Sequence, residues 1–376
     1  MKIAYDAKRI TNNVTGLGNY SRFVVNNLAQ QYQQDEFLLL SPNLIEHGMK
    51  KLIADCSNIK FVPPPACAKM QKAIWRSWNI HEDIKSLKPD LYHGLTNELP
   101  FTIKKTKVKS VVTIHDLIFR HYPRFYKQID RLIYDFKFRK ACHDADQIVA
   151  VSECTKRDVM RFYGIAPEKI KVIYQGCHEQ FMVKADEIQK KQVTQKFNLP
   201  NEFILSVGTV EERKNLLLTV KALKLSGLKT KLIVIGRKTN YAQQVDQFIV
   251  ENGMQNQVSY LSDVSYVELP IVYQLASLFV YPSLYEGFGI PIIEALHSGI
   301  PVIAATGSCL EEAGGESSIY VNPNSTTELA EKIQLVLHDK NLQQKMIADG
   351  LNYVQRFDHT KLTHQMMELY EKTLKS

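Results

Sequence analysis

The sequence predicts an α/β protein of two domains, each built on a parallel sheet covered by helices on both faces. Its 376 residues are too many for one ordinary domain, and short apolar runs alternate with helical segments along most of the chain. The alternation stops in a strandless stretch rich in Lys, Gln and Glu, and then restarts. We therefore expect a first domain over residues 1–180, a linker over 181–201 and a second domain over 202–356.

The expected strands are short runs of mainly β-branched or aromatic residues, each closed by a polar or small residue. In the first domain they cover residues 3–6, 37–41, 90–93, 110–115, 147–151 and 171–174, with an amphipathic helix over 19–32. In the second domain they cover residues 203–208, 231–236, 258–261, 278–281 and 301–304. Ligands of doubly wound sheets bind at the carboxyl ends of the strands. We therefore seek the site in the residues that follow strands, and expect it between the two domains.

Composition excludes several classes of protein. With 45% hydrophobic and 23% charged residues, the chain is neither disordered nor fibrous. At least ten residues separate any two of its six cysteines, which predicts reduced core thiols and neither a redox pair nor a zinc site. Asp6 precedes any apolar stretch that could serve as a signal peptide, and no apolar run is long enough to span a membrane, so we expect a cytoplasmic protein.

Positive charge is concentrated in the first half of the chain. Residues 1–180 hold 28 Lys and Arg against 18 Asp and Glu, whereas residues 181–376 hold 19 against 21. The first domain should therefore face a phospholipid surface, a lipid diphosphate or nucleic acid. The segment 119–140 interleaves basic with aromatic residues, and Trp75 and Trp78 lie in a second basic stretch. This mixture predicts peripheral contact with an anionic membrane, the alternative being a solvated helix face over an ordinary core.

A glycine pair follows the first strand. Gly16 and Gly18 lead into the amphipathic helix, and such residues allow a phosphate to approach the backbone at a helix start. The alternative is a glycine turn that caps an ordinary helix. Ser21 replaces the third glycine of a dinucleotide fingerprint, and the loop from Asp6 to Thr15 is too long for one, so an NAD site is disfavoured.

Two cations follow the first strand of the second domain. Arg213 and Lys214 come shortly after Thr209 and precede a Leu-rich helix. Positive charge at a helix start opposes the helix dipole and is favourable only beside an anion. The planar fork of Arg and the point charge of Lys together suit a diphosphate, the alternative being two solvated charges.

The run 281–294 is the most informative segment. A strand ends, a loop between glycines carries Glu286, and Pro291 starts a helix whose first turn we expect to hold Glu294. Two carboxylates at one crevice fit a polyhydroxyl ligand, because sugar and ribose hydroxyls donate hydrogen bonds to them. Glu294 taken alone could instead satisfy the helix start.

One histidine and one pair of aspartates are further candidates for the site. His115 closes the strand 110–115 at its carboxyl end, where a site residue belongs, although a lone histidine is more often structural. Asp144 and Asp146 imitate a D-x-D metal motif but precede the strand 147–151, away from the crevice. No other group has the spacing of metal ligands, so we expect no metal.

With these residues in place, the chain resembles the retaining glycosyltransferases of family 4, whose fold is GT-B, over nearly its whole length. The spacing of Glu286 and Glu294, with the Glu-Gly-Phe-Gly core, matches that family's E-x7-E signature. Glu311 stands where the family has proline and Gln175 where it often has asparagine, and neither departure touches the donor diphosphate. The resemblance rests on residues 16–20, 113–118, 151–156, 206–209, 213–215 and 281–294.

The resemblance implies a role for each candidate. Arg213 and Lys214 would bind the donor diphosphate, Glu286 the transferred sugar, Glu294 the ribose, and His115 the sugar and the leaving phosphate. His115, Glu286, Arg213 and Lys214 form the implied catalytic set. Residues 357–376 would form a helix that returns to the first domain. The implied donor-binding set is Gly16, Gly18, Thr209, Arg213, Lys214, Glu286, Gly287, Phe288, Gly289 and Glu294.

The resemblance also implies an activity: transfer of a hexose with retention of configuration, without metal or cofactor, the leaving phosphate accepting the acceptor's proton. The chain is similar to bacterial mannosyltransferases of surface-polysaccharide assembly, which makes GDP-mannose the expected donor and a glycan or lipid-linked glycan the expected acceptor, with no nucleic acid partner. The alternatives are a nucleotide-sugar 2-epimerase, an α-glucan phosphorylase and a non-catalytic sugar-nucleotide-binding subunit. The last should have lost some of the catalytic set, and all of it is present.

Overall fold

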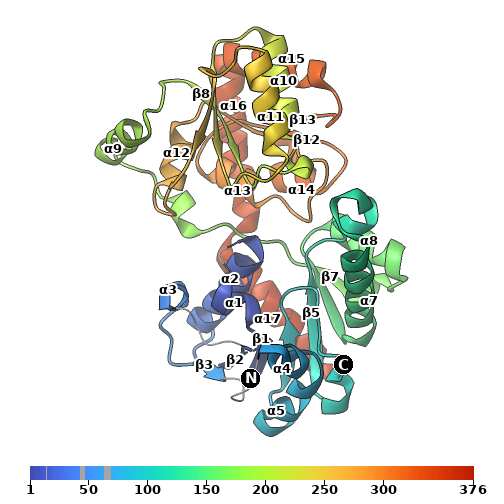
Figure 1. Cartoon of the computed structure of the whole chain (residues 1–376). Coiled ribbons are helices and arrows are strands. Elements are labelled where there is room, and N and C mark those ends of the chain that lie inside the picture. The colour runs from blue at the N-terminus through green and yellow to red at the C-terminus, as the bar shows by residue number, and fades with distance from the viewer. Residues whose placement is uncertain (14, 43–46, 63–68) are drawn as a thin grey trace. The chain divides into compact units, whose positions relative to one another are not determined.

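The structure, a computed structural model, describes residues 1–13, 15–42, 47–62 and 69–376. The chain forms two compact units (Figure 1): Met1–Gly176 with Phe357–Ser376, and Cys177–Arg356. The segment 181–201, predicted as a linker, is part of the second unit. It contains α9 (Glu187–Phe197), which starts at a capping box and packs against α12 (Leu269–Leu275). A strandless stretch here is a helix of the domain, not a connection between domains.

The first domain is built on seven parallel strands in the order β3-β2-β1-β4-β5-β6-β7. The order reverses between β1 and β4, so the crevice of this sheet opens at the carboxyl ends of those strands. The edge strand β3 was not predicted, because it is short and only partly buried. The strands are β1 (Lys2–Asp6), β2 (Glu36–Leu40), β3 (Ile59–Val62), β4 (Leu91–Gly94), β5 (Lys109–Ile114), β6 (Gln147–Ala150) and β7 (Ile170–Val172).

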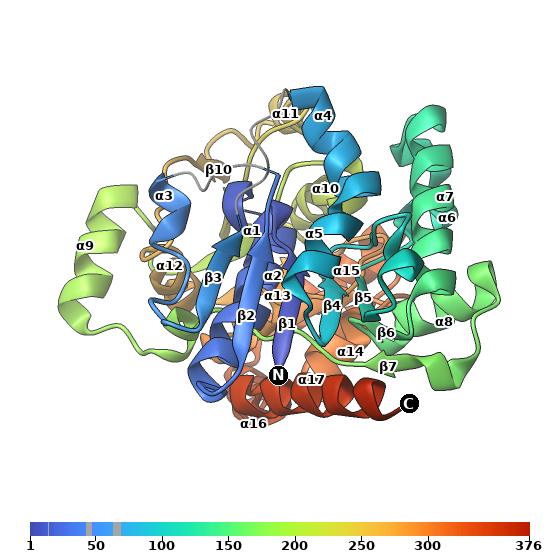
Figure 2. The same cartoon turned by 90° about the horizontal axis from the view of Figure 1, so that it is seen from below.

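Helices cover this sheet, and the C-terminal helix is one of them. α17 (His359–Lys375) crosses the first domain and packs against α2 (Figure 2). The stretch between Asp6 and Thr15, predicted as a loop, contains the short helix α1. The other described helices are α1 (Lys8–Asn12), α2 (Gly16–Gln31), α3 (His47–Lys50), α4 (Lys69–Ile74), the π-helix η1 (Trp75–Asn79), α5 (Ile80–Leu87), η2 (Ile103–Thr106), α6 (Ile118–His121), η3 (Pro123–Phe125), α7 (Gln128–Asp144), α8 (Glu153–Tyr163) and η4 (Pro167–Lys169).

The second domain is built on six parallel strands in the order β10-β9-β8-β11-β12-β13. Its switch point lies between β8 and β11. The edge strand β13 was not predicted, because it has only three residues, two of them half-buried. The strands are β8 (Phe203–Val207), β9 (Lys231–Ile235), β10 (Val258–Leu261), β11 (Leu278–Tyr281), β12 (Val302–Ala305) and β13 (Ile319–Val321).

Apolar helix faces close the second core, which includes the packing of α10 on α15. The other helices of this domain are η5 (Glu179–Met182), η6 (Glu212–Lys214), α10 (Leu216–Ser226), α11 (Ala242–Glu251), α13 (Ile290–His297), α14 (Leu310–Gly314), η7 (Gly315–Ser317), α15 (Thr326–His338), α16 (Lys340–Tyr353) and η8 (Val354–Phe357). Across both domains four of the predicted core cysteines are buried thiols, Cys56 is half-buried and Cys67 lies outside the described residues.

Candidate functional site

The switch point of the second sheet joins the two predicted cations to Glu286. η6 follows β8 and the loop that carries Glu286 follows β11, and these strands are neighbours. Lys214 Nζ lies 2.6 Å from Glu286 Oε1, and Arg213 Nη1 lies 2.5 Å from Glu286 Oε2. The Arg213 carbonyl accepts a hydrogen bond from the Leu284 N–H, which ties the two segments together. The structure thus brings together three of the four residues of the implied catalytic set.

The charges of this cluster are strongly coupled. Burial alone would raise the pKa of Glu286, but Arg213 and Lys214 outweigh it and lower that pKa to about 2. Burial lowers the pKa of Lys214, an effect that Glu286 partly opposes. The Glu286 side chain is only 12% exposed, so water screens the cluster weakly. The pair of cations therefore stands in a poorly hydrated place where added negative charge is favourable.

Two hydroxyl groups that sequence reasoning missed complete the cluster. Ser283 Oγ donates to Glu286 Oε1 over 2.8 Å, and Tyr281 Oη donates to the same oxygen over 3.1 Å. Lys214 Nζ also donates to Tyr281 Oη and lies 4.7 Å from the centre of its ring. Both residues belong to the run 281–294, and their position at the end of β11 was the signal that could have identified them.

Thr209 lies in the turn between β8 and η6. Gly208 adopts a φ of +139°, a conformation that L side chains rarely reach, and its N–H donates to the Ile235 carbonyl. This turn brings the chain close to Gly236, where a Cβ atom would meet the Gly208 carbonyl oxygen at 1.9 Å. Thr209 is half-buried and is not in the Lys214–Glu286 cluster; the structure places it beside that cluster on the same strand end.

Glu294 lies deeper in its helix than predicted. α13 begins at Ile290, so Glu294 is in the second turn rather than the first, and it does not satisfy the helix start. Its Oε2 accepts a hydrogen bond of 3.0 Å from Tyr273 Oη on α12, a partner that sequence reasoning missed. Burial raises the pKa of Glu294 to about 7. Unlike Glu286, this carboxyl exchanges its proton near neutral pH.

The loop between Glu286 and Glu294 forms hydrogen bonds with a buried cysteine thiol. Cys309 Sγ donates to the Phe288 carbonyl over 2.6 Å and to the Glu286 carbonyl over 3.1 Å. Gly289 precedes α13 and packs so closely that an added Cβ atom would meet the Cβ of Ala313 at 2.7 Å. The two carbonyl oxygens share the single thiol proton, and this contact together with the close packing of Gly289 restrains the loop of Glu286, Gly287, Phe288 and Gly289.

In the first domain, His115 follows β5 and is buried. Its Nε2 lies 2.9 Å from the Leu95 carbonyl oxygen, and its backbone N–H donates to Asn97 Oδ1 over 2.7 Å. A carbonyl oxygen only accepts, so Nε2 carries the proton. Burial lowers the pKa of His115 to about 4, partly opposed by the Leu95 hydrogen bond. At neutral pH the ring is therefore uncharged, with Nδ1 as an acceptor.

A chain of buried polar groups supports the His115 ring. The ring of Tyr20 meets it edge to face at 4.7 Å, and Tyr20 Oη lies 3.0 Å from Thr113 Oγ1. Thr113 is 2.9 Å from His93 Nε2, and His93 Nδ1 is 2.7 Å from Tyr370 Oη on α17. The C-terminal helix thus takes part in fixing the surroundings of His115.

The two glycines of the first domain differ in function. A Cβ atom on Gly18 would meet the Asn13 carbonyl oxygen at 1.9 Å, and the Gly18 N–H donates to Asn13 Oδ1 over 3.2 Å. Gly18 is thus explained by packing, as in the simple turn that was the alternative. Among the described residues, and apart from its chain neighbours and its own helix backbone, a Cβ atom on Gly16 would meet no atom within 4 Å. Gly16, the first residue of α2, is therefore open on the side where its side chain would be.

A buried ion cluster also lies at this end of the first sheet. Arg76 Nε donates to Asp6 Oδ2 over 2.8 Å, and Arg76 Nη1 donates to Glu98 Oε2 over 2.7 Å. Asp6 ends β1, and Glu98 lies in the loop after β4. The same loop provides the Leu95 carbonyl that binds the His115 ring. Sequence reasoning missed this cluster, because its members are far apart in the chain.

The rejected D-x-D motif has a structural role. Asp146 Oδ2 accepts hydrogen bonds from the Ser110 N–H and Oγ over 2.8 and 3.0 Å, at the amino end of the sheet. Within residues 1–13, 15–42, 47–62 and 69–376, no group of three or more His, Cys, Asp or Glu residues is placed to hold a metal ion.

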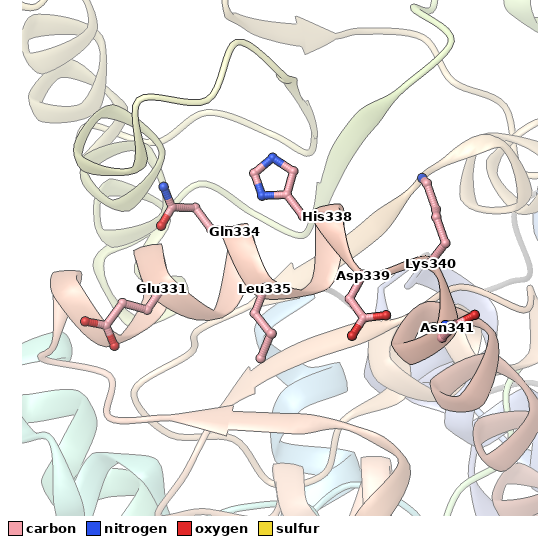
Figure 3. Close-up of a pocket in the computed structure, with 7 residues that line it drawn as sticks. All are labelled: Glu331, Gln334, Leu335, His338, Asp339, Lys340 and Asn341. Carbon is pink, nitrogen blue, oxygen red and sulfur yellow. The ribbon is translucent and has the colours of Figure 1, made fainter.

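A surface hollow in the second domain lies away from these residues. Figure 3 shows Gln334 and His338 on one side of α15 and Glu331 and Leu335 on the other, with Asp339 and Lys340 beyond its end. Gln334 donates to the Ser226 carbonyl and Asp339 accepts from the Leu342 N–H, so both are occupied by structural bonds. We assign this hollow no function.

Two doubly wound parallel sheets, with a cation pair and a carboxylate at the switch point of the second, define this protein as a glycosyltransferase with the GT-B fold. The family model described as "Glycosyl transferases group 1" matches residues 187–353, and the one described as "Glycosyltransferase Family 4" matches residues 14–181. The chain belongs to this glycosyltransferase family. The family and the fold inferred from the sequence are thereby confirmed, and the epimerase, phosphorylase and non-catalytic alternatives are not favoured.

Similar proteins agree with this assignment. The O-antigen chain mannosyltransferase B of Escherichia coli is 26% identical over 387 residues, which cover 99% of this chain and 100% of that protein. The O-antigen chain mannosyltransferase RfbU of Salmonella typhimurium is 31% identical over 249 residues, 66% of this chain and 65% of that protein. A glycosyltransferase from Rickettsia africae has a TM-score of 0.79 at 21% identity, covering 100% of this chain and 99% of that one. The structure of Anabaena HepE in complex with UDP-glucose has a TM-score of 0.79 at 18% sequence identity, covering 99% of this chain and 100% of that one.

None of the helices in the described parts of the chain combines the length and the apolar character needed to cross a membrane.

Proposed function

We propose that this protein transfers mannose from GDP-mannose, with retention of configuration, to a glycan or lipid-linked glycan in surface-polysaccharide synthesis. The observation that carries the proposal is the cluster of Arg213, Glu286 and Lys214 at the switch point of the second sheet. Its support for mannose is the likeness, over the whole chain, to an O-antigen mannosyltransferase. We further propose that it acts at the cytoplasmic face of a membrane.

In this proposal the second domain binds the donor. Arg213 and Lys214 bind the diphosphate, which supplies the negative charge that their poorly hydrated surroundings favour. Glu286 has two oxygens and several lone pairs, so it can stay paired with Lys214 while it accepts a hydrogen bond from the sugar. The amides of Gly287 to Gly289 face the same sugar, and Glu294 accepts hydrogen bonds from the ribose. Thr209, beside the cluster, contacts the phosphates.

The first domain contributes His115 and the start of α2. Because His115 is uncharged with Nδ1 as an acceptor, we assign it a hydrogen bond from a hydroxyl of the donor sugar. An uncharged ring that already donates from Nε2 has no proton to offer the leaving phosphate, so we assign His115 no contact with that phosphate. Gly16, open where a side chain would stand, admits the diphosphate close to the backbone.

The chemistry needs no protein base and no metal ion. The bond between the sugar and the diphosphate breaks as a bond to the acceptor oxygen forms on the same face, and the acceptor's proton passes to the leaving phosphate. Arg213 and Lys214 stabilise the growing negative charge on the leaving phosphate. Removing one such donor lowers kcat by roughly a hundredfold in comparable sites. Turnover should be unchanged by EDTA, and the product should keep the anomeric configuration of the donor by NMR.

A thermal-shift panel tests the donor. GDP-mannose should raise the melting temperature of the purified chain more than UDP-glucose or ADP-glucose, since a ligand at 100 times its Kd adds about 2.7 kcal/mol of stability. The Lys214→Ala variant should lose most of this shift, whereas Lys340→Ala, a surface lysine on α16, should keep it. A larger shift with UDP- or ADP-sugars would exclude GDP-mannose, and no shift with any nucleotide sugar would contradict the proposed function.

A further inference from the structure

One face of α7 is apolar and exposed. Its inner face, which includes Phe138 and Cys142, packs in the core of the first domain. The outer face carries an apolar stripe at positions i, i+3, i+4 and i+7, the spacing of a single helix face. The exposed fractions are 60% for Ile129, 62% for Leu132, 44% for Ile133 and 61% for Phe136. Scattered single apolar residues are ordinary on a surface, but a continuous stripe of four indicates contact with something else.

The stripe continues onto neighbouring segments. The ring of Phe136 lies 5.7 Å from that of Phe101, and Phe101 lies 4.9 Å from Trp78, centre to centre. Trp78, on η1, is 52% exposed. We call Ile129, Leu132, Ile133 and Phe136 together with Phe101 and Trp78 the α7 patch. Figures 1 and 2 both show α7 on the outside of the first domain.

Cations lie at both ends of the α7 patch. The segment from residue 119 to residue 140 carries seven Lys and Arg against two Asp. Lys104, on η2, is 68% exposed and reaches Asp144 at the end of α7. Arg124 and Lys127 lie at the other end, just before the helix begins, and both are exposed. An apolar stripe with cations at both ends matches the border between the acyl chains and the phosphates of an anionic bilayer.

The α7 patch adjoins the loop after β4, which forms a hydrogen bond with His115. Lys137, on α7, lies 3.5 Å from Glu98, and Glu98 is also bound by Arg76 of the buried ion cluster. The loop that carries Glu98 provides the Leu95 carbonyl for His115. A surface in contact with α7 would therefore lie beside the carboxyl end of the first sheet.

We propose that the α7 patch docks this protein on an anionic phospholipid surface, with the stripe in the acyl boundary and the cations on the headgroups. This inference rests on the proposed function only in its purpose, since a lipid-linked acceptor would then arrive beside His115. A second copy of the chain would match the apolar stripe but not the cations that flank it, because those would face each other across a two-fold interface.

Trp78 provides a direct test. It is one of two tryptophans, and the other, Trp75, is buried with an exposure of 5%. Vesicles of phosphatidylcholine with 30% phosphatidylglycerol should shift the Trp78 emission to the blue and carry the protein into the pellet, and pure phosphatidylcholine should do so about tenfold less well. The Trp78→Phe variant should lose the spectral shift.

Matched variants separate the α7 patch from general stickiness. The double variant Leu132→Ser with Phe136→Ser should bind the anionic vesicles at least about tenfold more weakly. Ile188→Ser with Leu225→Ser, which changes two comparably exposed apolar residues of the second domain, should bind like the wild type. Arg124→Gln with Lys127→Gln should lose the preference for anionic lipid and serves as the second variant if the apolar one fails to fold.

Several outcomes would overturn the inference: no vesicle binding by the wild type, equal binding to neutral vesicles, or an equal loss in the control pair. A wild-type dimer that Leu132→Ser with Phe136→Ser converts to a monomer would assign the patch to a second copy instead. The thermal shift with GDP-mannose is the separate readout of the proposed function. If that shift is intact and vesicle binding is absent, the inference fails while the function stands.

Discussion

Donor binding should depend on pH through Glu294. Burial raises the pKa of this carboxyl to about 7, so about one tenth of the molecules carry it ionised at pH 6 and about nine tenths at pH 8. Ribose hydroxyls donate hydrogen bonds, and the ionised carboxylate is the better acceptor. We therefore expect the Kd for GDP-mannose to fall about tenfold between pH 6 and pH 8.

The same carboxyl should make stability depend on pH in the opposite direction. Its pKa is higher in the folded than in the unfolded chain, so the folded state binds more protons and loses stability as pH rises from about 4.5 to about 7. The loss is at most about 3 kcal/mol, and the partial exposure of Glu294 reduces it. Glu294→Gln removes the ionisation at nearly constant size, so this variant should be more stable than the wild type at pH 8 and bind the donor less well.

Calorimetry at pH 6, 7 and 8 in the absence of acceptor measures this effect. The diphosphate of a nucleotide sugar is esterified at both ends and does not titrate in this range, so any change belongs to the protein. The Kd of Glu294→Gln should be independent of pH. A flat wild-type profile, or the same slope in both proteins, would refute the role given to Glu294.

Further substitutions test the other site residues. Glu286→Gln should lower kcat by about a hundredfold with little change in donor KM, because its contact tightens as the sugar flattens, and equal effects on kcat and KM would contradict this. His115→Ala should also lower kcat by roughly a hundredfold while leaving calorimetric binding of GDP unchanged; a joint loss of melting temperature and binding would mark a structural histidine. Burial lowers the pKa of His93 to about 3 and of His115 to about 4, so the folded state binds fewer protons than the unfolded state below pH 6.5. Through the two histidines, stability should fall as pH drops from 6.5 towards 4, by up to about 1.4 kcal/mol per pH unit for each. Glu294 acts in the opposite direction, so the test uses Glu294→Gln: urea midpoints of this variant that coincide at pH 7 and 5 would exclude the histidine effect.

Most of the sheet structure could be predicted from the sequence. The residues expected for β10, an edge strand, match the structure at both ends. Those expected for β11 also match, because a continuous apolar run is what a strand buried on both faces requires. β3 and β13 lack that pattern, since edge strands are short and partly wet. The same reasoning misplaced the linker, because it treated the strandless segment that contains α9 as a connection.

The candidate site was predicted residue by residue but not as an arrangement. The rule that ligands meet strand ends selected Lys214 and Glu286 separately, and only the order of β8 and β11 makes them neighbours. Contacts across long separations left no local signal: Tyr273 reaches Glu294 from another helix, and Arg76 joins Asp6 across the first sheet. The tautomer of His115 depends on the Leu95 carbonyl, which no side-chain pattern could reveal.

The return of α17 to the first domain has a consequence for synthesis. Tyr370 is a hydrogen-bond partner of buried His93 and accepts a hydrogen bond from buried Tyr5. These two side chains of the first domain therefore lack this partner until α17 has been synthesised. At about 5 to 20 residues per second, the ribosome needs roughly 10 to 40 s to add the second domain before it reaches α17. During that time the second domain, which is continuous in sequence, can fold first although it is made later. The first domain meanwhile lacks α17, and its folding can be completed only after the whole second domain has been made.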